Sequence, residues 1–211
     1  MSITITISRC IIRRTQALLS KYLPVKVEQV LCCKLTQLQM DIYKSFCNSD
    51  TIRRSLKASD DAKMTSSSLA AITSLKKLVN HPDLVHPACL ERKEGFENAL
   101  EIFPAGHDPV RGRLRPELSG KLTILDCLLA VVRSTTTDKV VLVSNYTQTL
   151  DMFERLCALR NYGYVRLDGS MSIKKRAKVV DQFNDPTSGQ FIFMLSSKAG
   201  GCGLNLIGAN R

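Results

Sequence analysis

The alternation of apolar strands and helices in residues 119–211 restricts the fold of this chain more than any other feature. The strands are apolar on both faces, which indicates a parallel sheet that is covered by helices on both sides. We expect strands at residues 139–144, 164–167 and 191–195, with helices at residues 121–132, 147–159 and 172–183. The sequence therefore predicts an α/β fold with a parallel sheet.

Residues 1–118 show a different pattern, which predicts a mostly helical region with at least one strand. Strands are expected at residues 3–7 and 25–35, and helices at residues 9–22, 37–47 and 69–79. Thr36 can cap the helix that follows it. Residues 48–68 are polar, and residues 66–68 are typical of a loop or of the entry to a helix. Residues 87–119, which contain four prolines, predict an irregular connector.

The chain carries a formal net charge of +11, and the excess of basic residues is shared about equally by these two regions. A surplus that is spread over the whole body suits a protein that lies along a polyanion such as nucleic acid. A soluble basic protein without such a partner would fit the charge equally well.

Of the eight cysteines, Cys32 and Cys33 are adjacent and the other six are scattered, with no CxxC pair, which indicates reduced thiols in a cytosolic or nuclear protein. His81, His86 and Cys89 lie close together, but prolines separate them and a fourth ligand is missing, so no metal site is expected. We expect no membrane span, because the longest apolar stretch, residues 122–132, is too short and contains Asp126. We expect no signal peptide, because residues 1–8 lack a continuous apolar segment.

Three polar clusters follow the predicted strands, at the edge where open parallel sheets bind their ligands. The first cluster includes Ser144, Asn145 and Thr147, and its hydroxyls and amides could hold a phosphate at a helix start. Taken alone, it fits an ordinary helix cap better. The second cluster is a basic helical turn formed by Lys174, Lys175 and Arg176. Positive charge there opposes the helix dipole, so the turn either faces an anion or is a solvated basic face.

The third cluster, residues 196–206, directly follows an apolar strand and is the most specific of the three. Its glycines are Gly200, Gly201 and Gly203, and its polar residues include Ser197, Lys198 and Asn205. Glycine lets the backbone approach a ligand closely, and exposed backbone amides can bind phosphate oxygens. A purely structural loop rarely needs so many glycines among polar residues, so we favour a ligand-binding role.

These clusters belong to an ordered series of motifs that resembles a known family. The motifs are IRRT (12–15), KYLP (21–24), LKKLVNHP (75–82), LSGK (118–121), SNYTQTL (144–150), RLDGSMSIKKR (166–176) and the glycine-rich block that continues to residue 211. Together they resemble the Swi/Snf group of superfamily-two ATPases, and within it most closely the eukaryotic translocases of recombinational DNA repair.

The resemblance implies three parts in the chain. Residues 1–10 carry none of the motifs, residues 11–118 would be the end of the first RecA-like lobe with a helical linker, and residues 119–211 would be a truncated second RecA-like lobe. Such P-loop-type motors hold ATP and Mg between two lobes and track along duplex DNA. By position, DNA would contact Ser144, Asn145, Thr147, Lys174, Lys175, Arg176, Ser197, Lys198 and Gly200, and the nucleotide would lie near Gly201, Gly203 and Asn205.

The resemblance also implies partners and a location. The partners would be double-stranded DNA, a recombinase filament and chromatin, and the location would be the nucleus. Binding through phosphates would be independent of DNA sequence and sensitive to salt.

ATP hydrolysis needs parts that the sequence does not show. It contains no GxxxxGK[ST] loop, no apolar run that ends in an Asp-Glu pair, and no sixth motif with arginine fingers. We therefore expect that this chain by itself binds neither ATP nor Mg tightly, and neither hydrolyses ATP nor translocates. Two alternatives remain open: a non-catalytic truncated isoform that binds DNA or partners and competes with the full motor, and the second lobe of an RNA helicase.

Overall fold

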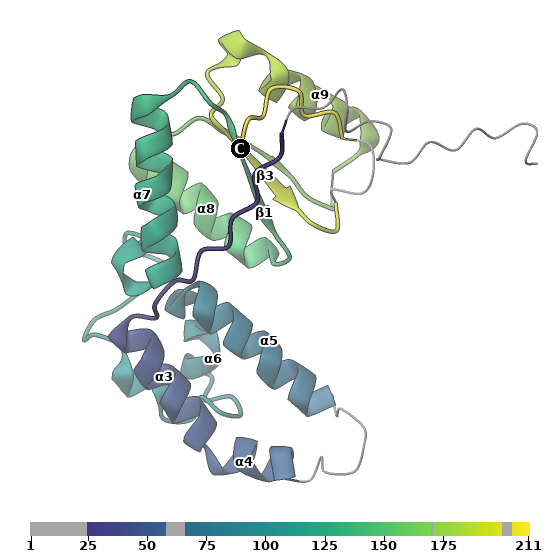
Figure 1. Ribbon diagram of the computed structural model, residues 1–211. Coiled ribbons are helices and arrows are strands. Elements are labelled where there is room, and N and C mark those ends of the chain that lie inside the picture. The colour runs from purple at the N-terminus through teal and green to yellow at the C-terminus, as the bar shows by residue number, and fades with distance from the viewer. Residues whose placement is uncertain (1–24, 58–65, 170, 200–203) are drawn as a thin grey trace, which may run out of the picture. The chain divides into compact units, whose positions relative to one another are not determined.

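The computed structural model describes residues 25–57, 66–169, 171–199 and 204–211 (Figure 1). The chain divides into two compact units, residues 1–32 and 33–211. The strand expected at residues 3–7 and the helix expected at residues 9–22 lie outside the described residues. All helices and strands described below belong to the second unit.

A parallel sheet of three strands forms the centre of the α/β region. The strands are β1 (Val140–Ser144), β2 (Tyr164–Leu167) and β3 (Ile192–Ser196), in the spatial order β1-β3-β2. Ile192 of β3 is level with Val140 of β1 and with Tyr164 of β2, so the carboxyl ends of all three strands reach the same edge. The predicted parallel sheet is confirmed.

Helices cover both faces of this sheet, because the side chains of β3 alternate between two hydrophobic cores. Ile192 and Met194 join a core with α7 (Gly120–Thr135) and α8 (Thr147–Arg160), whereas Phe193 joins a core with α9 (Ile173–Asn184). Figure 1 shows α8 between α7 and the strands. The interpretation of strands that are apolar on both faces is therefore confirmed.

The residues before α7 form a helical region with a hydrophobic core of its own. Its helices are α3 (Gln37–Asn48), α4 (Asp50–Lys57), α5 (Ser66–Asn80) and α6 (His86–Leu90), with 3-10 turns η1 (Pro82–Leu84), η2 (Ala99–Ile102) and η3 (Pro116–Leu118). Thr36 caps α3 as expected, and Gln39 completes a capping box. A fourth 3-10 turn, η4 (Pro186–Ser188), follows α9.

In this helical core the backbone of Gly95 packs directly against an aromatic ring. Gly95 has a φ of +86°, and a Cβ at this position would overlap the ring of Phe46. The ring centroids of Phe46 and Phe96 are 4.9 Å apart, and both rings are buried. Only glycine therefore fits at residue 95 without moving the core.

In this part of the chain one expectation was wrong and one helix was not predicted. The strand expected at residues 25–35 is absent, because a strand needs a hydrogen-bonded neighbour and the three described strands pair only with one another. The polar residues before Ser66 gave no sign of α4, which is anchored by the buried side chain of Ile52. The helix entry named at residues 66–68 is the start of α5. No helix among the described residues is both long and apolar enough to cross a membrane.

Candidate nucleic-acid interface at the carboxyl ends of the strands

The carboxyl ends of β1 and β3 lie side by side and are tied together by hydrogen bonds. Ser144 is level with Ser196, and the backbone N–H of Ser197 donates to the Ser144 carbonyl at 3.0 Å. The Ser197 hydroxyl donates to Asn145 Oδ1 at 2.5 Å. The structure thus brings together the predicted residues Ser144, Asn145 and Ser197, from two separate sequence motifs.

The start of α8 follows this edge directly. Its first residue, Thr147, is exposed, and the preceding Tyr146 makes no side-chain cap. The Ser144 hydroxyl instead accepts from the backbone N–H of Tyr146 at 3.1 Å. Helix-start amides that lack a cap are available to water or to an anion, so this end of α8 suits a phosphate oxygen.

Lys198 brings positive charge to the same edge. Ser197 and Lys198 are exposed, and no carboxylate in the described part of the chain forms an ion pair with Lys198. The backbone N–H of Ala199 donates to the Ser196 carbonyl at 2.9 Å, which closes a turn around the two residues. This turn presents a hydroxyl and an ammonium group to solvent.

The basic first turn of α9 divides into two kinds of residue. Lys174 and Lys175 are exposed, whereas Arg176 is half-buried. The guanidinium of Arg176 donates to the carbonyls of Met171 at 3.2 Å and Ala199 at 3.1 Å. Arg176 therefore holds the start of α9 against the turn after β3, a structural role that its place in a basic run did not indicate.

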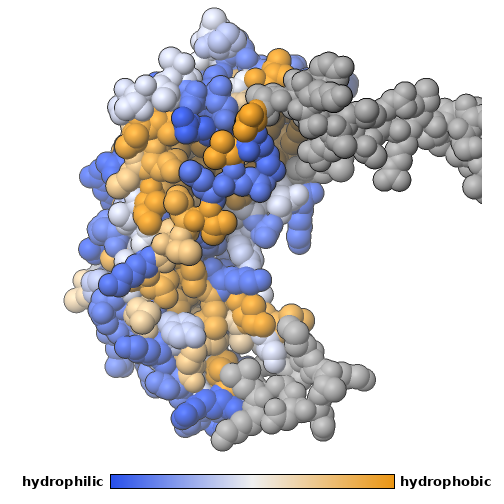
Figure 2. Space-filling view, viewed as in Figure 1, coloured by the Kyte–Doolittle hydropathy of each residue, from blue (hydrophilic) through white to orange (hydrophobic). Residues whose placement is uncertain are grey.

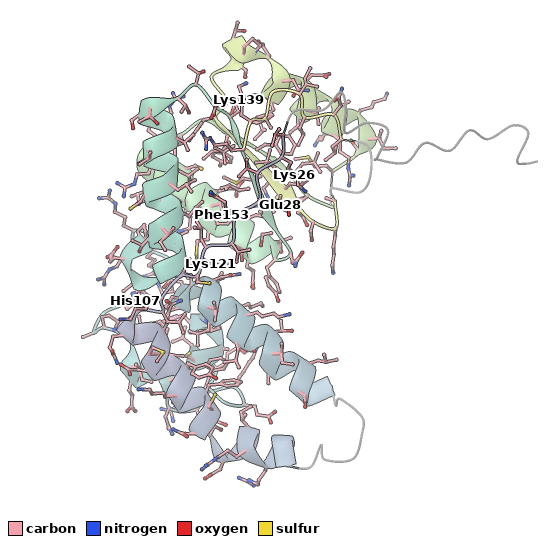
Figure 3. The ribbon with its side chains drawn as sticks, in the orientation of Figure 1. Lys26, Glu28, His107, Lys121, Lys139 and Phe153 are labelled. Atoms are coloured by element: carbon pink, nitrogen blue, oxygen red, sulfur yellow. The ribbon has the colours of Figure 1, made fainter. Side chains whose placement is uncertain are left out.

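Asn205, predicted near the nucleotide, lies at the other end of the sheet. Its carbonyl accepts from Asn184 Nδ2 at 2.9 Å, and Asn184 is the last residue of α9. Lys139, which precedes β1, donates to the carbonyl of the neighbouring Phe183 at 2.5 Å (Figure 3). Asn205 is thus separated from Ser197 and Lys198. The predicted residues Gly200, Gly201 and Gly203 lie outside the described residues.

Arg166 organises three carboxylates near the same sheet edge, and the sequence did not single it out. Its Nη1 lies 2.6 Å from Asp151 Oδ1 and 2.8 Å from Glu154 Oε2, both on α8. Its Nε lies 3.2 Å from Asp168 Oδ2. Arg166 offsets one of the three negative charges and ties the start of α8 to the end of β2. Among the described residues, no group of His, Cys, Asp and Glu side chains could hold a metal.

A cluster of histidines surrounds Asp83 in the helical region. His81 Nε2 lies 3.1 Å from the Arg115 carbonyl, which can only accept, and His81 Nδ1 accepts from the Asp83 N–H at 3.1 Å. Both ring nitrogens are therefore satisfied by the neutral imidazole, and burial keeps the pKa of His81 below its usual value. His107 Nε2 lies 2.9 Å from Asp83 Oδ1, and its ring stands 5.5 Å from that of His86.

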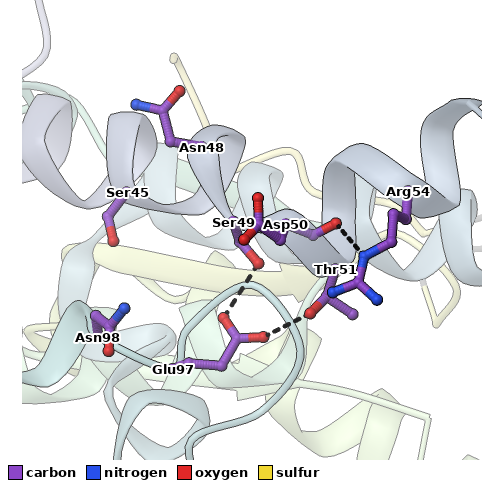
Figure 4. Close-up of a pocket in the computed structure, with 8 residues that line it drawn as sticks. All are labelled: Ser45, Asn48, Ser49, Asp50, Thr51, Arg54, Glu97 and Asn98. Carbon is purple, nitrogen blue, oxygen red and sulfur yellow. Dashed lines mark hydrogen bonds between the residues drawn. The ribbon is translucent and has the colours of Figure 1, made fainter.

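A polar pocket lies between the end of α3, the start of α4 and residues 97–98 (Figure 4). Glu97 accepts hydrogen bonds at 3.2 Å from the hydroxyls of both Ser49 and Thr51. Burial raises the pKa of Glu97, but these bonds and those from backbone amides outweigh it and lower the pKa overall. The Glu97 carboxylate thus joins the loop to the α3–α4 junction, so we assign it a structural role.

Comparisons with known proteins agree with these features. The SNF2-related domain model matches residues 2–84, which include most of residues 1–10, and the helicase conserved C-terminal domain model matches residues 120–211. The protein described as DNA repair and recombination protein RAD54-like is 62% identical in Gallus gallus, over 97% of this chain and 27% of that protein. Its Homo sapiens counterpart is 60% identical over 99% of this chain and 27% of that protein. The chain therefore spans about a quarter of the length of these relatives.

Solved structures give the same assignment for the fold. The crystal structure of the C-terminal part of the Fun30 ATPase domain has a TM-score of 0.64 at 26% identity, and covers 89% of this chain and 73% of that chain. The Sulfolobus solfataricus SWI2/SNF2 ATPase core in complex with dsDNA has a TM-score of 0.64 at 22% identity, and the match covers 99% of this chain and 39% of that chain. At this identity the similarity supports the fold alone. An SNF2-related segment is followed along the chain by a helicase C-terminal segment, which contains the RecA-like sheet. The chain therefore belongs to the Swi2/Snf2 family.

Proposed function

We propose that this chain is part of an ATP-dependent translocase on double-stranded DNA that acts in DNA repair by homologous recombination. The identity of 60% to 62% with RAD54-like proteins over nearly the whole chain supports this assignment. The structural observation that carries it is the hydrogen bond between Ser197 and Asn145, which joins two polar motifs beside the exposed Lys198.

This edge suits the phosphate backbone of duplex DNA. It combines hydroxyl groups, the uncapped start of α8 and the ammonium group of Lys198, and each of these can contact a phosphate oxygen. Lys174 and Lys175 add two exposed cations at the start of α9, after the neighbouring strand β2. None of these groups reads a base, so binding would not depend on DNA sequence and would weaken as salt rises.

ATP and Mg belong to the complete motor in this proposal. Hydrolysis of ATP supplies the free energy for movement along DNA, and this chain contributes the second lobe with part of the DNA track. Because the sequence shows no phosphate loop, no Asp-Glu pair after an apolar run and no arginine fingers, we expect the isolated chain to bind neither ATP nor Mg tightly. A nuclear location and contacts with a recombinase filament and chromatin are further parts of the proposal, supported by the identity with RAD54-like proteins.

Fluorescence anisotropy with a labelled DNA duplex, measured over a series of salt concentrations, tests the proposed function. We expect wild-type protein to bind at low salt and Lys198→Ala to bind more weakly, with a slope of log K against log salt that is lower by about one. Lys44→Ala is the matched control, because Lys44 is also exposed but lies on α3.

Two outcomes would contradict the proposal. One is the absence of duplex binding at low salt, and the other is an equal effect of the Lys198 and Lys44 substitutions. Tighter binding to single-stranded RNA than to duplex DNA would instead support the second lobe of an RNA helicase.

A further inference from the structure

A groove of about 530 Å³ opens beside the end of β1 and extends from the edge described above. One wall is α5, with Lys76 and Asn80, and the opposite wall is the end of β1 with the two residues after it. Lys121, near the start of α7, also lines the groove (Figure 3). We propose that the DNA backbone continues into this groove, where Lys76 and Lys121 contact further phosphates. This inference rests on the proposed function and extends its site.

The groove and the strand edge form one continuous surface. Asn145 lines the groove, and its Oδ1 accepts the 2.5 Å hydrogen bond from the Ser197 hydroxyl. Ser144 also lines the groove, and its carbonyl accepts from the Ser197 N–H. A strand of nucleic acid that contacts Ser197 and Lys198 therefore reaches the groove by passing Asn145.

The charge of the groove is complementary to phosphate. Its lining contains two lysines and no carboxylate. Both lysines are exposed, and neither forms an ion pair within the described segments of the chain. Two unpaired cations beside hydroxyl and amide groups form a surface that attracts an anionic backbone.

Lys121 is held in position by a neutral partner. Its Nζ donates to Asn80 Oδ1 at 2.9 Å, while Asn80 Nδ2 donates to Thr149 Oγ1 at 3.4 Å. The Asn80 carbonyl accepts from the Ser119 hydroxyl at 2.7 Å, which links the end of α5 to the residue before α7. Asn80 therefore orients the ammonium group without cancelling its charge, and the remaining donors of that group stay available for a phosphate.

Apolar side chains complete the walls of the groove. Ile72 and Val79 of α5 are 41% and 39% exposed, and Val143 of β1 is 57% exposed. Hydrophobic side chains are also visible along α5 in Figure 2. They can pack against deoxyribose, whereas an acidic amphipathic peptide would use the same combination of cations and apolar surface. Continuity with the Ser197 edge favours DNA.

The test compares Lys76→Ala, Lys121→Ala and the double variant in the duplex-binding salt series. We expect each single substitution to lower the slope of log K against log salt by about one, and the double substitution by about two. The matched control is Lys77→Ala, because Lys77 lies next to Lys76 on α5 but does not line the groove. Thermal unfolding identifies any variant that fails to fold, and Lys76→Ala, at an exposed position, keeps the test decisive if Lys121→Ala unfolds.

The outcomes separate this inference from the function on which it rests. If wild-type protein binds duplex DNA and depends on Lys198, but the groove substitutions leave the slope unchanged, the inference is wrong and the proposed function stands. The inference is also wrong if those substitutions abolish binding of a labelled peptide rich in Glu and Leu while the DNA slope is unchanged. If wild-type protein does not bind duplex DNA at all, both fail.

Discussion

The Ser197 hydroxyl lies 2.5 Å from Asn145 Oδ1, so two residues from separate motifs meet across the ends of β1 and β3. Both side chains are exposed, and neither is needed to fill a hydrophobic core. Their hydrogen bond fixes the Asn145 amide at the point where the strand edge joins the groove beside α5. The bond therefore organises a surface rather than an interior.

A double-mutant cycle measures the strength of this pairing. We expect Ser197→Ala and Asn145→Ala each to lower the free energy of unfolding by less than about 1 kcal/mol, with a coupling of about 0.5 kcal/mol between them. Both single variants should weaken duplex binding, because each disturbs the same polar edge. Urea unfolding gives the coupling, and strictly additive stabilities would show that the two side chains do not interact.

Substitution of Gly120 tests the packing at the start of α7. A Cβ at this position would overlap the backbone carbonyl of Lys34, so we expect Gly120→Ala to lower the free energy of unfolding by about 1–3 kcal/mol. Helix propensity alone would predict a gain, smaller than the value of about 1 kcal/mol for a helix interior because Gly120 is the first residue of α7, so the sign of the change is decisive. Gly169→Ala is the matched control, because no atom lies within 4 Å of the added Cβ. Equal urea midpoints for the two variants would contradict the prediction.

Acid should destabilise the chain through its buried histidines. Burial lowers the pKa of both His81 and His86, so the unfolded chain takes up protons at these residues more readily than the folded chain. Their stabilising contribution is present above the unfolded pKa of about 6.5 and is lost as the pH falls through the folded values. Asp83 opposes the shift in both residues, but burial is the larger effect.

Thermal unfolding between pH 7.5 and pH 5.5 measures this effect. We expect the melting temperature to fall over this interval in the wild type and to fall less in His86→Phe, which retains an aromatic ring beside Phe103 but cannot be protonated. Carboxylates such as Glu97, whose pKa is lowered, act in a more acidic range and do not account for a change near pH 6. A melting temperature that stays constant across the interval would rule the prediction out.

Hydrophobic patterning was sufficient to predict the α/β region. Residues such as Phe193 and Met194 are neighbours in sequence and are both buried, which is possible in a strand only if helices cover both faces of the sheet. The same pattern was too weak for α4, where the buried residue Ile52 stands among polar and charged residues. It misled at residues 25–35, because an alternating pattern cannot supply a partner strand.

The candidate site was predictable as a location but not in its detailed contacts. The rule that ligands bind at the carboxyl ends of parallel strands placed Asn145 and Ser197 at one edge. The structural role of Arg176 depends on the carbonyl of Ala199, and the orientation of Lys121 depends on Asn80. These pairs are distant in sequence and belong to different elements, so only the folded chain reveals them.

The cluster around Asp83 also makes the chain suitable for spectroscopy. The chain has three histidines in total, and all of them lie in this cluster. Imidazole resonances in a nuclear magnetic resonance spectrum therefore come from the helical region alone, without signals from the α/β region to be subtracted. A change in the helical region could thus be followed while the protein is titrated with duplex DNA, with no label added to the protein.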